Sequence, residues 1–168
     1  MMWTNSIRRT WVIVMFTATA CLAAGPSSAA GQDRVDPRSA IDALFEGMRQ
    51  ADARRVRSVL APDARFALLD GREGAGRVRV QSVDAWVDAI STSGGGWDEQ
   101  TYDVEVKVDG AMASIWAPYT FYLNGAISHC GVNSFELLHD AEGWKITQIS
   151  DTRTREECPD PLGATAGW

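Results

Sequence analysis

The chain has 168 residues, of which 22 are acidic and 16 are basic, and its formal net charge is −6 at pH 7. The arginines between residues 34 and 79 form neither a run nor a helical stripe, so the clustered basic surface of a nucleic-acid-binding protein is not predicted. With two histidines and no nucleotide-binding glycine motif, the sequence also predicts no metal centre and no cofactor.

Residues 1–30 are typical of a secretory signal peptide. A pair of arginines precedes the apolar stretch 11–24, and small residues lead up to Ala30, after which we expect cleavage. The apolar stretch is shorter than the roughly 20 residues that span a bilayer, so a retained membrane anchor is the less favoured alternative. Lipidation at Cys21 is another alternative, although the residues before it match a lipobox poorly. We therefore predict a periplasmic or secreted protein whose mature chain has no membrane span.

Cleavage would leave one domain, 31–158, followed by a flexible tail, 159–168. It would also remove two arginines and no acid, which moves the formal charge from −6 to −8. The mature chain keeps two cysteines, Cys130 and Cys158. In an oxidising compartment such a pair predicts a disulfide, which would stabilise the fold by roughly 3.5 kcal/mol on a chain-entropy argument. Two unpaired thiols are the alternative.

Three amphipathic helices are predicted in the first half of this domain. Asp36 is a good N-cap, and apolar residues at i, i+3, i+4 and i+7 from Ile41 form one stripe. Asp52 caps a second, short helix that Pro62 ends. Ser82 caps a third helix, which is followed by a glycine-rich loop. Each helix therefore has one apolar face to bury against another layer.

From Trp97 onward the period of the apolar residues changes from helical to alternating. Asp109-Gly110 and Asn124-Gly125 are strong hairpin signals between the alternating segments. The predicted strands are 65–70, 77–81, 101–108, 111–123, 127–139 and 144–153. Helices first and an antiparallel meander last indicate an α+β fold.

The register of the hairpins decides which side chains share a face of the sheet. We predict that Val108 pairs with Ala111 across a two-residue loop. In the last hairpin a bulge near Thr147 is needed to keep the large apolar side chains inside. Pro118 cannot donate a hydrogen bond within a central strand, so we expect a bend there that helps the sheet to curl.

For the second hairpin, a strict two-residue loop would turn large apolar side chains away from the core. A three-residue loop, 123–125, keeps them inside and is the prediction adopted. This choice sets His129 beside Tyr119 and Asn133 beside Ile115.

Five polar side chains are then predicted on the concave face of the sheet: Tyr119, His129, Asn133, Asp151 and Arg153. An acid, a base, an amide and a phenol beneath three helices are typical of a small-molecule pocket. Each also has a structural explanation, with His129 and Tyr119 as core residues and Asp151 paired with Arg153 at a strand end. In this register His129 and Asp151 lie roughly 10 Å apart along the strands, so a direct dyad is not expected.

The opposite face of the long strands is also apolar, with Met112, Trp116, Tyr122 and Val132 pointing outward. An apolar face of this kind usually meets a partner, and a twofold sheet-on-sheet homodimer would bury it. Cover by the C-terminal tail is the alternative.

Several segments resemble known proteins. The helix–Ala51-Asp52–helix opening and the segment 61–66 that follows it are similar to the nuclear transport factor 2-like superfamily. Segments 78–82, 116–122, 129–135 and 143–146 resemble its lumazine-binding branch more narrowly, and the likeness spans about residues 38–158. The resemblance implies a cone-shaped roll of three N-terminal helices on a curled, mainly antiparallel sheet, an architecture shared with ketosteroid isomerases and polyketide cyclases.

The resemblance leaves three functions open, because this superfamily contains enzymes, binders and interaction modules. The first is an exported protein that binds a small molecule. The second is an isomerase, cyclase or dehydratase, in which His129 and Asp151 would transfer protons and Tyr119 would stabilise an oxyanion. The third is a non-catalytic dimerisation or accessory module.

Overall fold

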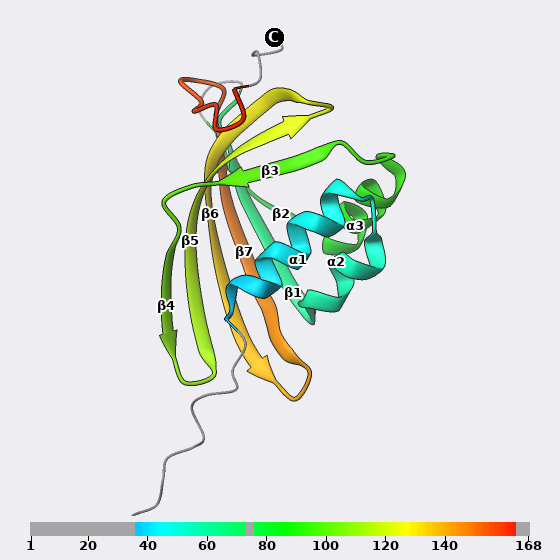
Figure 1. Cartoon of the computed structure of the whole chain (residues 1–168), viewed down its shortest axis with the longest axis vertical. Helices are drawn as coiled ribbons and strands as arrows, with labels where there is room; N and C mark the ends of the chain where they lie inside the picture. Colours follow the sequence, from blue (N-terminus) through cyan, green and yellow to red (C-terminus); the bar gives the residue numbers. More distant parts are fainter. Residues whose placement is uncertain (1–35, 73–75, 164–168) are drawn as a thin grey trace, which may run out of the picture. The chain divides into compact units, whose positions relative to one another are not determined.

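Figure 1 shows the computed structural model, in which residues 36–72 and 76–163 are described. The predicted signal peptide, its cleavage site and Cys21 lie outside these residues. The elements are α1 (Arg38–Arg49), α2 (Ala53–Val59), β1 (Leu60–Asp70), β2 (Val78–Gln81), α3 (Val83–Thr92), β3 (Trp97–Thr101), β4 (Glu105–Asp109), β5 (Met112–Leu123), β6 (Ala126–Asp140) and β7 (Gly143–Arg153). Within the described part of the chain, no helix is long and apolar enough to cross a membrane.

Two of the three predicted capping residues, Asp52 and Ser82, begin their helices, whereas the N-cap of α1 is Pro37, one residue after the predicted Asp36. The carboxylate of Asp36 accepts a hydrogen bond from the backbone N–H of Arg38, at 2.9 Å. Asp52 and Ser82 are the N-caps of α2 and α3, and each side chain accepts from the first turn of its helix. These contacts satisfy backbone donors that a helix start leaves unpaired. The predicted stripe of α1 is buried, with Leu44 almost completely inaccessible.

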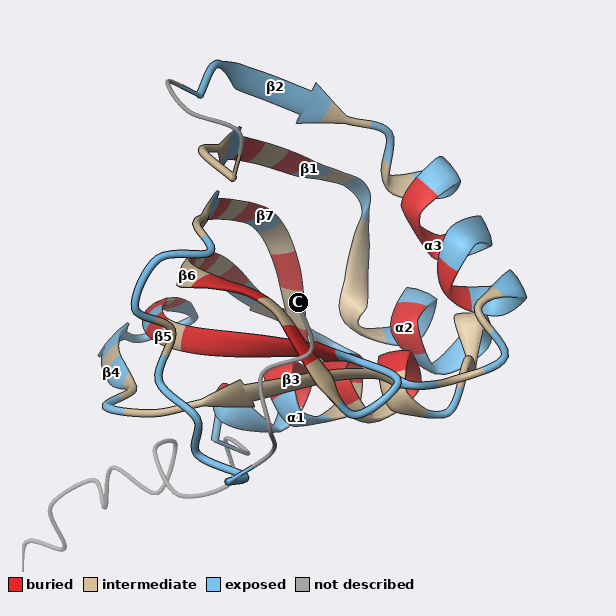
Figure 2. Ribbon diagram, turned by 90° about the horizontal axis from the view of Figure 1, so that it is seen from above, coloured by how far each residue is buried: buried red, intermediate tan, exposed pale blue. Residues whose placement is uncertain are grey.

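The strands form one curled sheet in the order β2-β1-β7-β6-β5-β3, and β4 pairs with the other half of β5. The pairing of β1 with β7 is parallel and the other pairings are antiparallel. The helices lie on one side of the sheet, where α1 contacts β3 and β7 while α2 and α3 contact β1. Figure 2 shows buried residues on the helix surfaces that face the sheet. The α+β prediction is therefore confirmed.

The end of α2 differs from the prediction. The helix ends at Val59, and Pro62 lies inside β1 instead of stopping the helix directly. Between Leu60 and Arg65 the register against β7 shifts, so residues 61–64 bulge out of the ladder. A proline is tolerated there because a bulge does not require its missing N–H.

The predicted loop between β5 and β6 is wrong. Asn124 and Gly125 both have positive φ, 53° and 81°, and form a two-residue loop. Ser128 is then an extra residue in β6, because the register shifts between the pairs before and after it. This bulge keeps the large apolar side chains of β6 on the inner face of the sheet, which is the effect that the three-residue loop was predicted to have. Consequently His129 pairs with Phe121, not with Tyr119.

Two further details of the meander differ, and one agrees. The turn after β4 is shifted, so Val108 pairs with Ala113 rather than with Ala111. The predicted strand 101–108 is interrupted at Asp103, which has a φ of 48°, and so β3 and β4 pair with different halves of β5. The bulge at Thr147 is confirmed by the register shift between β6 and β7.

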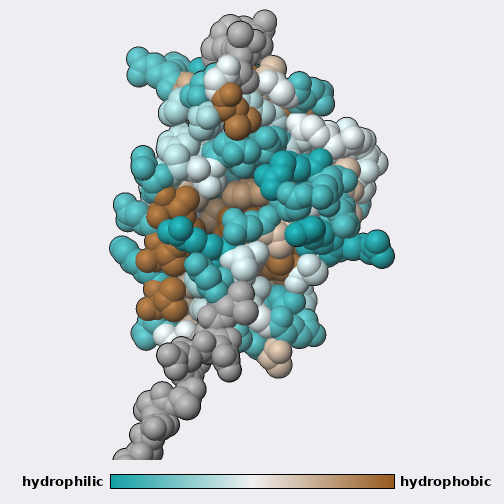
Figure 3. Space-filling model, in the orientation of Figure 1, coloured by the Kyte–Doolittle hydropathy of each residue, from teal (hydrophilic) through white to brown (hydrophobic). Residues whose placement is uncertain are grey.

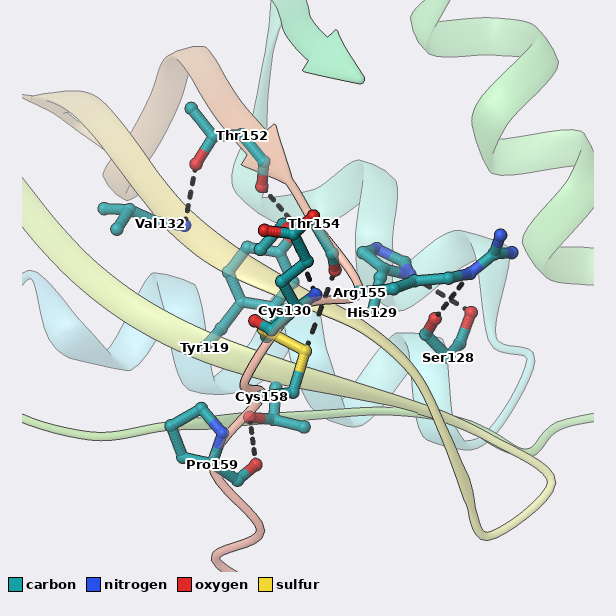
Figure 4. Close-up of a disulfide and its surroundings, with 12 residues drawn as sticks. Tyr119, Ser128, His129, Cys130, Val132, Thr152, Thr154, Arg155, Cys158 and Pro159 are labelled. Carbon is teal, nitrogen blue, oxygen red and sulfur yellow. Dashed lines mark hydrogen bonds between the residues drawn. A yellow bond between two sulfur atoms is a disulfide. The ribbon is translucent and has the colours of Figure 1, made fainter. Parts of the chain in front are cut away.

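Cys130 and Cys158 form a disulfide, which Figure 4 shows. Their Cα atoms are 5.5 Å apart. The segment that carries Cys158 lies against the convex face of β5. The hydroxyl of Thr120 donates to the Pro159 carbonyl and that of Tyr122 donates to Asp160 Oδ1, both at 2.7 Å. Hydrogen bonding to the domain therefore continues past residue 158.

This C-terminal segment changes the predicted dimer face. Tyr122 is completely buried beneath it, so Tyr122 is not part of an exposed surface. Met112 and Trp116 remain about half exposed, and Val132 is intermediate. Figure 3 shows apolar side chains gathered along the edge of the sheet at β4. Because Tyr122 is buried, the exposed apolar part of the convex face is narrower than the sequence indicated.

Candidate functional site

A cavity of about 290 Å³ lies between the concave face of the sheet and helices α1 and α3. Its apolar lining consists of Leu44, Phe45, Met48, Phe66, Trp86, Trp97, Phe121, Leu123, Phe135 and Ile149. Its polar lining consists of Arg72, Gln81, Glu99, Ser128, His129, Asn133, Asp151 and Arg153. Ligand pockets typically combine such a largely apolar wall with a few polar groups.

The aromatic side chains of the wall are held in edge-to-face pairs. Phe45 of α1 contacts Phe135 of β6, with ring centroids 6.2 Å apart. Phe66 contacts Trp86 at 5.2 Å, and Trp97 contacts Phe121 at 5.9 Å. Each pair joins two different elements, and this geometry is the favourable one for aromatic rings. The walls of the cavity are therefore fixed by packing before any ligand enters.

Asp151 and Arg153 form an ion pair at the polar end of the cavity. Arg153 donates to Asp151 Oδ2 through Nη2 at 2.8 Å and through Nε at 3.1 Å. The other oxygen, Oδ1, is buried and has no hydrogen-bond partner among the described residues. Burial raises the pKa of Asp151, and the charge of Arg153 opposes that shift. The predicted charge pair thus lines the cavity as well.

Glu99 is a cavity residue that the sequence analysis missed. It lies on β3, and its carboxylate accepts a hydrogen bond from Asn133 Nδ2. Burial, with the nearby charge of Asp151, raises the pKa of Glu99 to about 8, against the opposing effects of Asn133 and Arg153. The only sequence signal was its spacing of two residues from Trp97, which places both side chains on one face.

Asn133 connects the two acidic groups. It is buried on β6, where it pairs across the ladder with Asp151, and its amide reaches Glu99 on the far side of β5. Glu99 and Asp151 therefore flank Asn133 within one cavity. The predicted placement of Asn133 on the concave face is correct, although its neighbour on β5 is Ala117 instead of Ile115.

His129 lines the cavity but is not close to Asp151. It lies four residues from Asn133 along β6, which is about 13 Å in a strand. Its ring stacks at a tilt on Phe121, with centroids 4.9 Å apart, and Nδ1 is 3.1 Å from Ser128 Oγ. Burial, helped by the positive charges of Arg153 and Arg72, lowers the pKa of His129 to about 3. The imidazole is accordingly neutral at physiological pH.

Tyr119 does not line the cavity, contrary to the prediction. Its side chain is fully buried, and its hydroxyl donates to the carbonyl of Thr152 at 3.0 Å. Burial raises the pKa of Tyr119 above its ordinary value. A hydroxyl that already donates its proton to the backbone is poorly suited to stabilise an oxyanion, so Tyr119 is a core residue.

Arg72 is a second lining residue that the sequence analysis missed. It follows β1 and binds the carboxylate of Asp70 through two nitrogens, with Nε 2.8 Å from Oδ1. The guanidinium holds the pKa of Asp70 well below its usual range. Both arginines of the cavity are therefore paired with aspartates. Among the described residues, no three His, Cys, Asp or Glu side chains are grouped so that they could hold a metal ion.

Three helices packed on the concave face of a strongly curled sheet, with a cavity between the layers, define a cone-shaped α+β roll. The solved structures that share this architecture include the following three. A nuclear transport factor 2-like protein of unknown function from Shewanella baltica is 13% identical, with a TM-score of 0.55 over 74% of this chain and 92% of that chain. A "putative dehydratase" from Streptomyces avermitilis is 15% identical (TM-score 0.51; 69% and 91%), and a "putative ketosteroid isomerase" from Shewanella frigidimarina is 17% identical (0.51; 68% and 93%).

The chain therefore adopts the nuclear transport factor 2-like fold. No family model and no curated protein matches the sequence. At these identities the solved structures establish the architecture, and the function has to be argued from the cavity itself.

Proposed function

We propose that the protein binds a small molecule in the aromatic-lined cavity. The observation that carries this proposal is the combination of about 290 Å³ of space, six aromatic side chains in its wall and a cluster of buried polar groups at one end. A domain that served only as a structural module would gain stability by filling that space with side chains. The cavity instead has the buried side chains of Asn133 and Asp151 and the half-buried side chain of Glu99 in its wall, and polar groups removed from water need hydrogen-bond partners.

Native mass spectrometry of protein purified from its own host tests this proposal. We expect a small molecule to copurify, and to be lost when the cavity mouth is blocked by Leu123→Trp. Leu123 lines the cavity and is 43% exposed, so a larger side chain there obstructs entry. Leu69→Trp is the matched control, because Leu69 is 39% exposed and does not line the cavity. If the bound molecule is retained equally by both variants, the cavity is not the binding site.

We also propose that the protein is exported and belongs to the lumazine-binding branch of the superfamily. The signal-like sequence 1–30 and the disulfide support export, because disulfides persist in oxidising compartments. The motifs at 116–122 and 129–135 support the branch. N-terminal sequencing of the protein from its host tests export, since a mature chain beginning after Ala30 is expected.

A homodimer through the convex face of the sheet is part of the proposal. One cross-strand row runs from Trp116 through Ser134, Ser150 and Ala67 to Val80. Large side chains stand at both ends and small ones lie between, around a hollow of about 240 Å³ beside Trp116. A twofold axis would place the indole of each protomer into the hollow of the other, as an isologous interface requires.

Acid–base catalysis is the second candidate, in an isomerase, cyclase or dehydratase. It is favoured by two carboxyl groups with raised pKa values, Glu99 and Asp151, on either side of Asn133. His129 is a weak base because its pKa is lowered to about 3, so the proton-transfer role predicted for it passes to these carboxyl groups. The test is turnover of the copurified molecule: its complete survival, or turnover unaffected by Asp151→Asn and by Glu99→Gln, would exclude catalysis at this site.

A further inference from the structure

The C-terminal strap, which we define as residues 154–163, lies behind one wall of the cavity. Phe121 and Leu123 of β5 line the cavity. Thr120 and Tyr122, which alternate with them, point to the opposite side of the strand and are completely buried. The hydroxyls of these two residues donate to the strap, each over 2.7 Å. This end of β5 is therefore held between the cavity on one side and the strap on the other.

The strap is also joined to β6 at the place where β6 lines the cavity. Thr154 exchanges two backbone hydrogen bonds with Cys130, of 2.8 and 2.9 Å, and the disulfide of Cys130 closes the same link (Figure 4). Arg155 Nε donates to the carbonyl of Ser128 at 3.4 Å. Ser128 is the extra residue of the β6 bulge, and it lines the cavity together with its neighbour His129. The strap therefore holds the bulge that directs two side chains into the cavity.

The disulfide is the main attachment of the strap. Every residue from 155 to 163 is exposed except Cys158, which is partly exposed, so the strap buries little apolar surface of its own. Its hydrogen bonds add only a small net stabilisation, because water can replace each of them once the segment moves. Without the disulfide, the strap should leave the sheet for part of the time, and the tip of the β5–β6 hairpin should lose its support.

Given the proposed binding function, on which this inference depends, we propose that the Cys130–Cys158 disulfide controls the affinity of the cavity for its ligand. While the bond is closed, the hairpin tip is fixed and presents Phe121, Leu123 and His129 in the arrangement that binds. When a dithiol opens the bond, the tip becomes mobile, and the ligand is held less tightly because binding has to order these side chains again. The protein therefore holds its ligand under oxidising conditions and releases it to a dithiol.

The partner that this regulation implies is a dithiol, such as the paired thiols of a thiol–disulfide exchange protein. Cys158 is partly exposed and Cys130 is only 5% exposed, so a thiolate of the dithiol attacks the Cys158 sulfur. A mixed disulfide forms on Cys158, and the Cys130 sulfur leaves as a thiolate that takes up a proton. The second thiol of the reductant then displaces the Cys158 sulfur. In total the dithiol gives up two electrons and two protons and becomes a disulfide, while the protein gains two thiols.

Binding of naphthol, an aromatic probe with one polar group, tests the inference by isothermal titration calorimetry. The mature protein is measured in its disulfide-bonded form and after reduction with dithiothreitol. We expect the reduced protein to bind naphthol at least about tenfold more weakly, because the wall of the cavity is no longer ordered in advance. Cys158→Ser should bind as weakly as the reduced wild type and should not respond to dithiothreitol.

A control variant separates this effect from a general loss of stability. Val56 is completely buried on α2 and does not line the cavity. Val56→Ala should therefore lower the free energy of unfolding, as a core truncation does, and still bind naphthol as tightly as the wild type. Hydrogen–deuterium exchange should locate the change: reduction should speed exchange in residues 119–130 and leave residues 112–117 of the same hairpin protected.

The outcomes separate this inference from the proposed function. Equal binding of naphthol by the disulfide-bonded and the reduced protein overturns the inference and leaves the binding function standing. An equal loss of affinity in Val56→Ala and Cys158→Ser, unchanged exchange in residues 119–130, or loss of the fold on reduction, seen by circular dichroism, also overturns it, because the bond then serves no local purpose at the cavity. If the disulfide-bonded protein does not bind naphthol, the proposed function fails together with the inference.

Discussion

Replacing Glu99 by glutamine should stabilise the protein at high pH and have little effect at low pH. In the folded state the pKa of Glu99 is raised from 4.5 to about 8. A raised pKa means that the folded state holds its proton where the unfolded state has lost it. Stability from this group is therefore full below about pH 4.5 and is lost as the pH rises toward about 8. Glutamine cannot ionise and still accepts from Asn133, so the variant escapes this loss.

The magnitude follows from the size of the shift. The shift of about 3.5 pH units (8 minus 4.5) at 1.36 kcal/mol each gives an upper bound of about 5 kcal/mol. Because Glu99 retains some contact with solvent, we reduce this and expect about 2–3 kcal/mol. His129 titrates in both proteins, so its contribution largely cancels in the difference between variant and wild type, whereas the charge coupling between Glu99 and Asp151 is part of the difference.

Urea unfolding of wild type and Glu99→Gln at about pH 5 and about pH 8 measures the effect. We expect the variant to exceed the wild type by about 2–3 kcal/mol at the higher pH and by less than about 1 kcal/mol at the lower pH. Glu105→Gln should differ from wild type by less than about 0.5 kcal/mol at both. If the free energies of unfolding of Glu99→Gln and wild type differed by the same amount at the two pH values, the argument that Glu99 keeps its proton in the folded state would be refuted.

Three further predictions concern the frame around the cavity. Gly131→Ala should lower the free energy of unfolding by roughly 3 kcal/mol or more, because an added Cβ would lie 1.8 Å from the Thr152 carbonyl oxygen. An unchanged melting temperature would contradict the close approach of β6 and β7 at this position. Cys158→Ser should cost about 3.5 kcal/mol, since the disulfide closes a separation of 28 residues, and a reductant should destabilise the wild type but not the variant. Trp116→Glu should convert the proposed dimer to a monomer in light scattering while the cavity still retains the copurified molecule; a dimer that persists would exclude the convex face as the interface.

The sequence by itself was sufficient for most of the helix starts and for the faces of the strands, but not for the exact hairpin loops. Helix caps at Asp52 and Ser82, the stripe of α1 and the bulge at Thr147 were all predicted correctly. Each depends on contacts within a few residues or on a periodicity of 3.6 or 2, which can be read along the chain. Alternation, together with the bulge expected at Thr147, also predicted that His129, Asn133 and Asp151 lie on the inner face, because a side chain's face depends on the parity of its position between bulges.

The composition of the cavity was decided by tertiary structure. A shift of two residues in strand register leaves the inner face unchanged, so alternation could not distinguish the predicted pairing of His129 with Tyr119 from the observed pairing with Phe121. Whether an inward side chain meets open space or packed atoms depends on the elements above it. Tyr119 points inward, but its hydroxyl donates a hydrogen bond to the Thr152 carbonyl. Glu99 lies on β3, and its approach to Asn133 depends on the curl of the sheet.

The convex face also combines a feature that the sequence predicts with one that only the tertiary structure decides. Its apolar character was encoded by alternation, but Tyr122 became a core residue only because the disulfide holds the segment around Pro159 and Asp160 over β5. Local sequence therefore determined the helices, the strands and the face on which each side chain lies. Long-range packing determined which strands pair and which charged and hydrogen-bonding neighbours each inward side chain has. The energies of these contacts depend on distances that spacing along the chain does not encode.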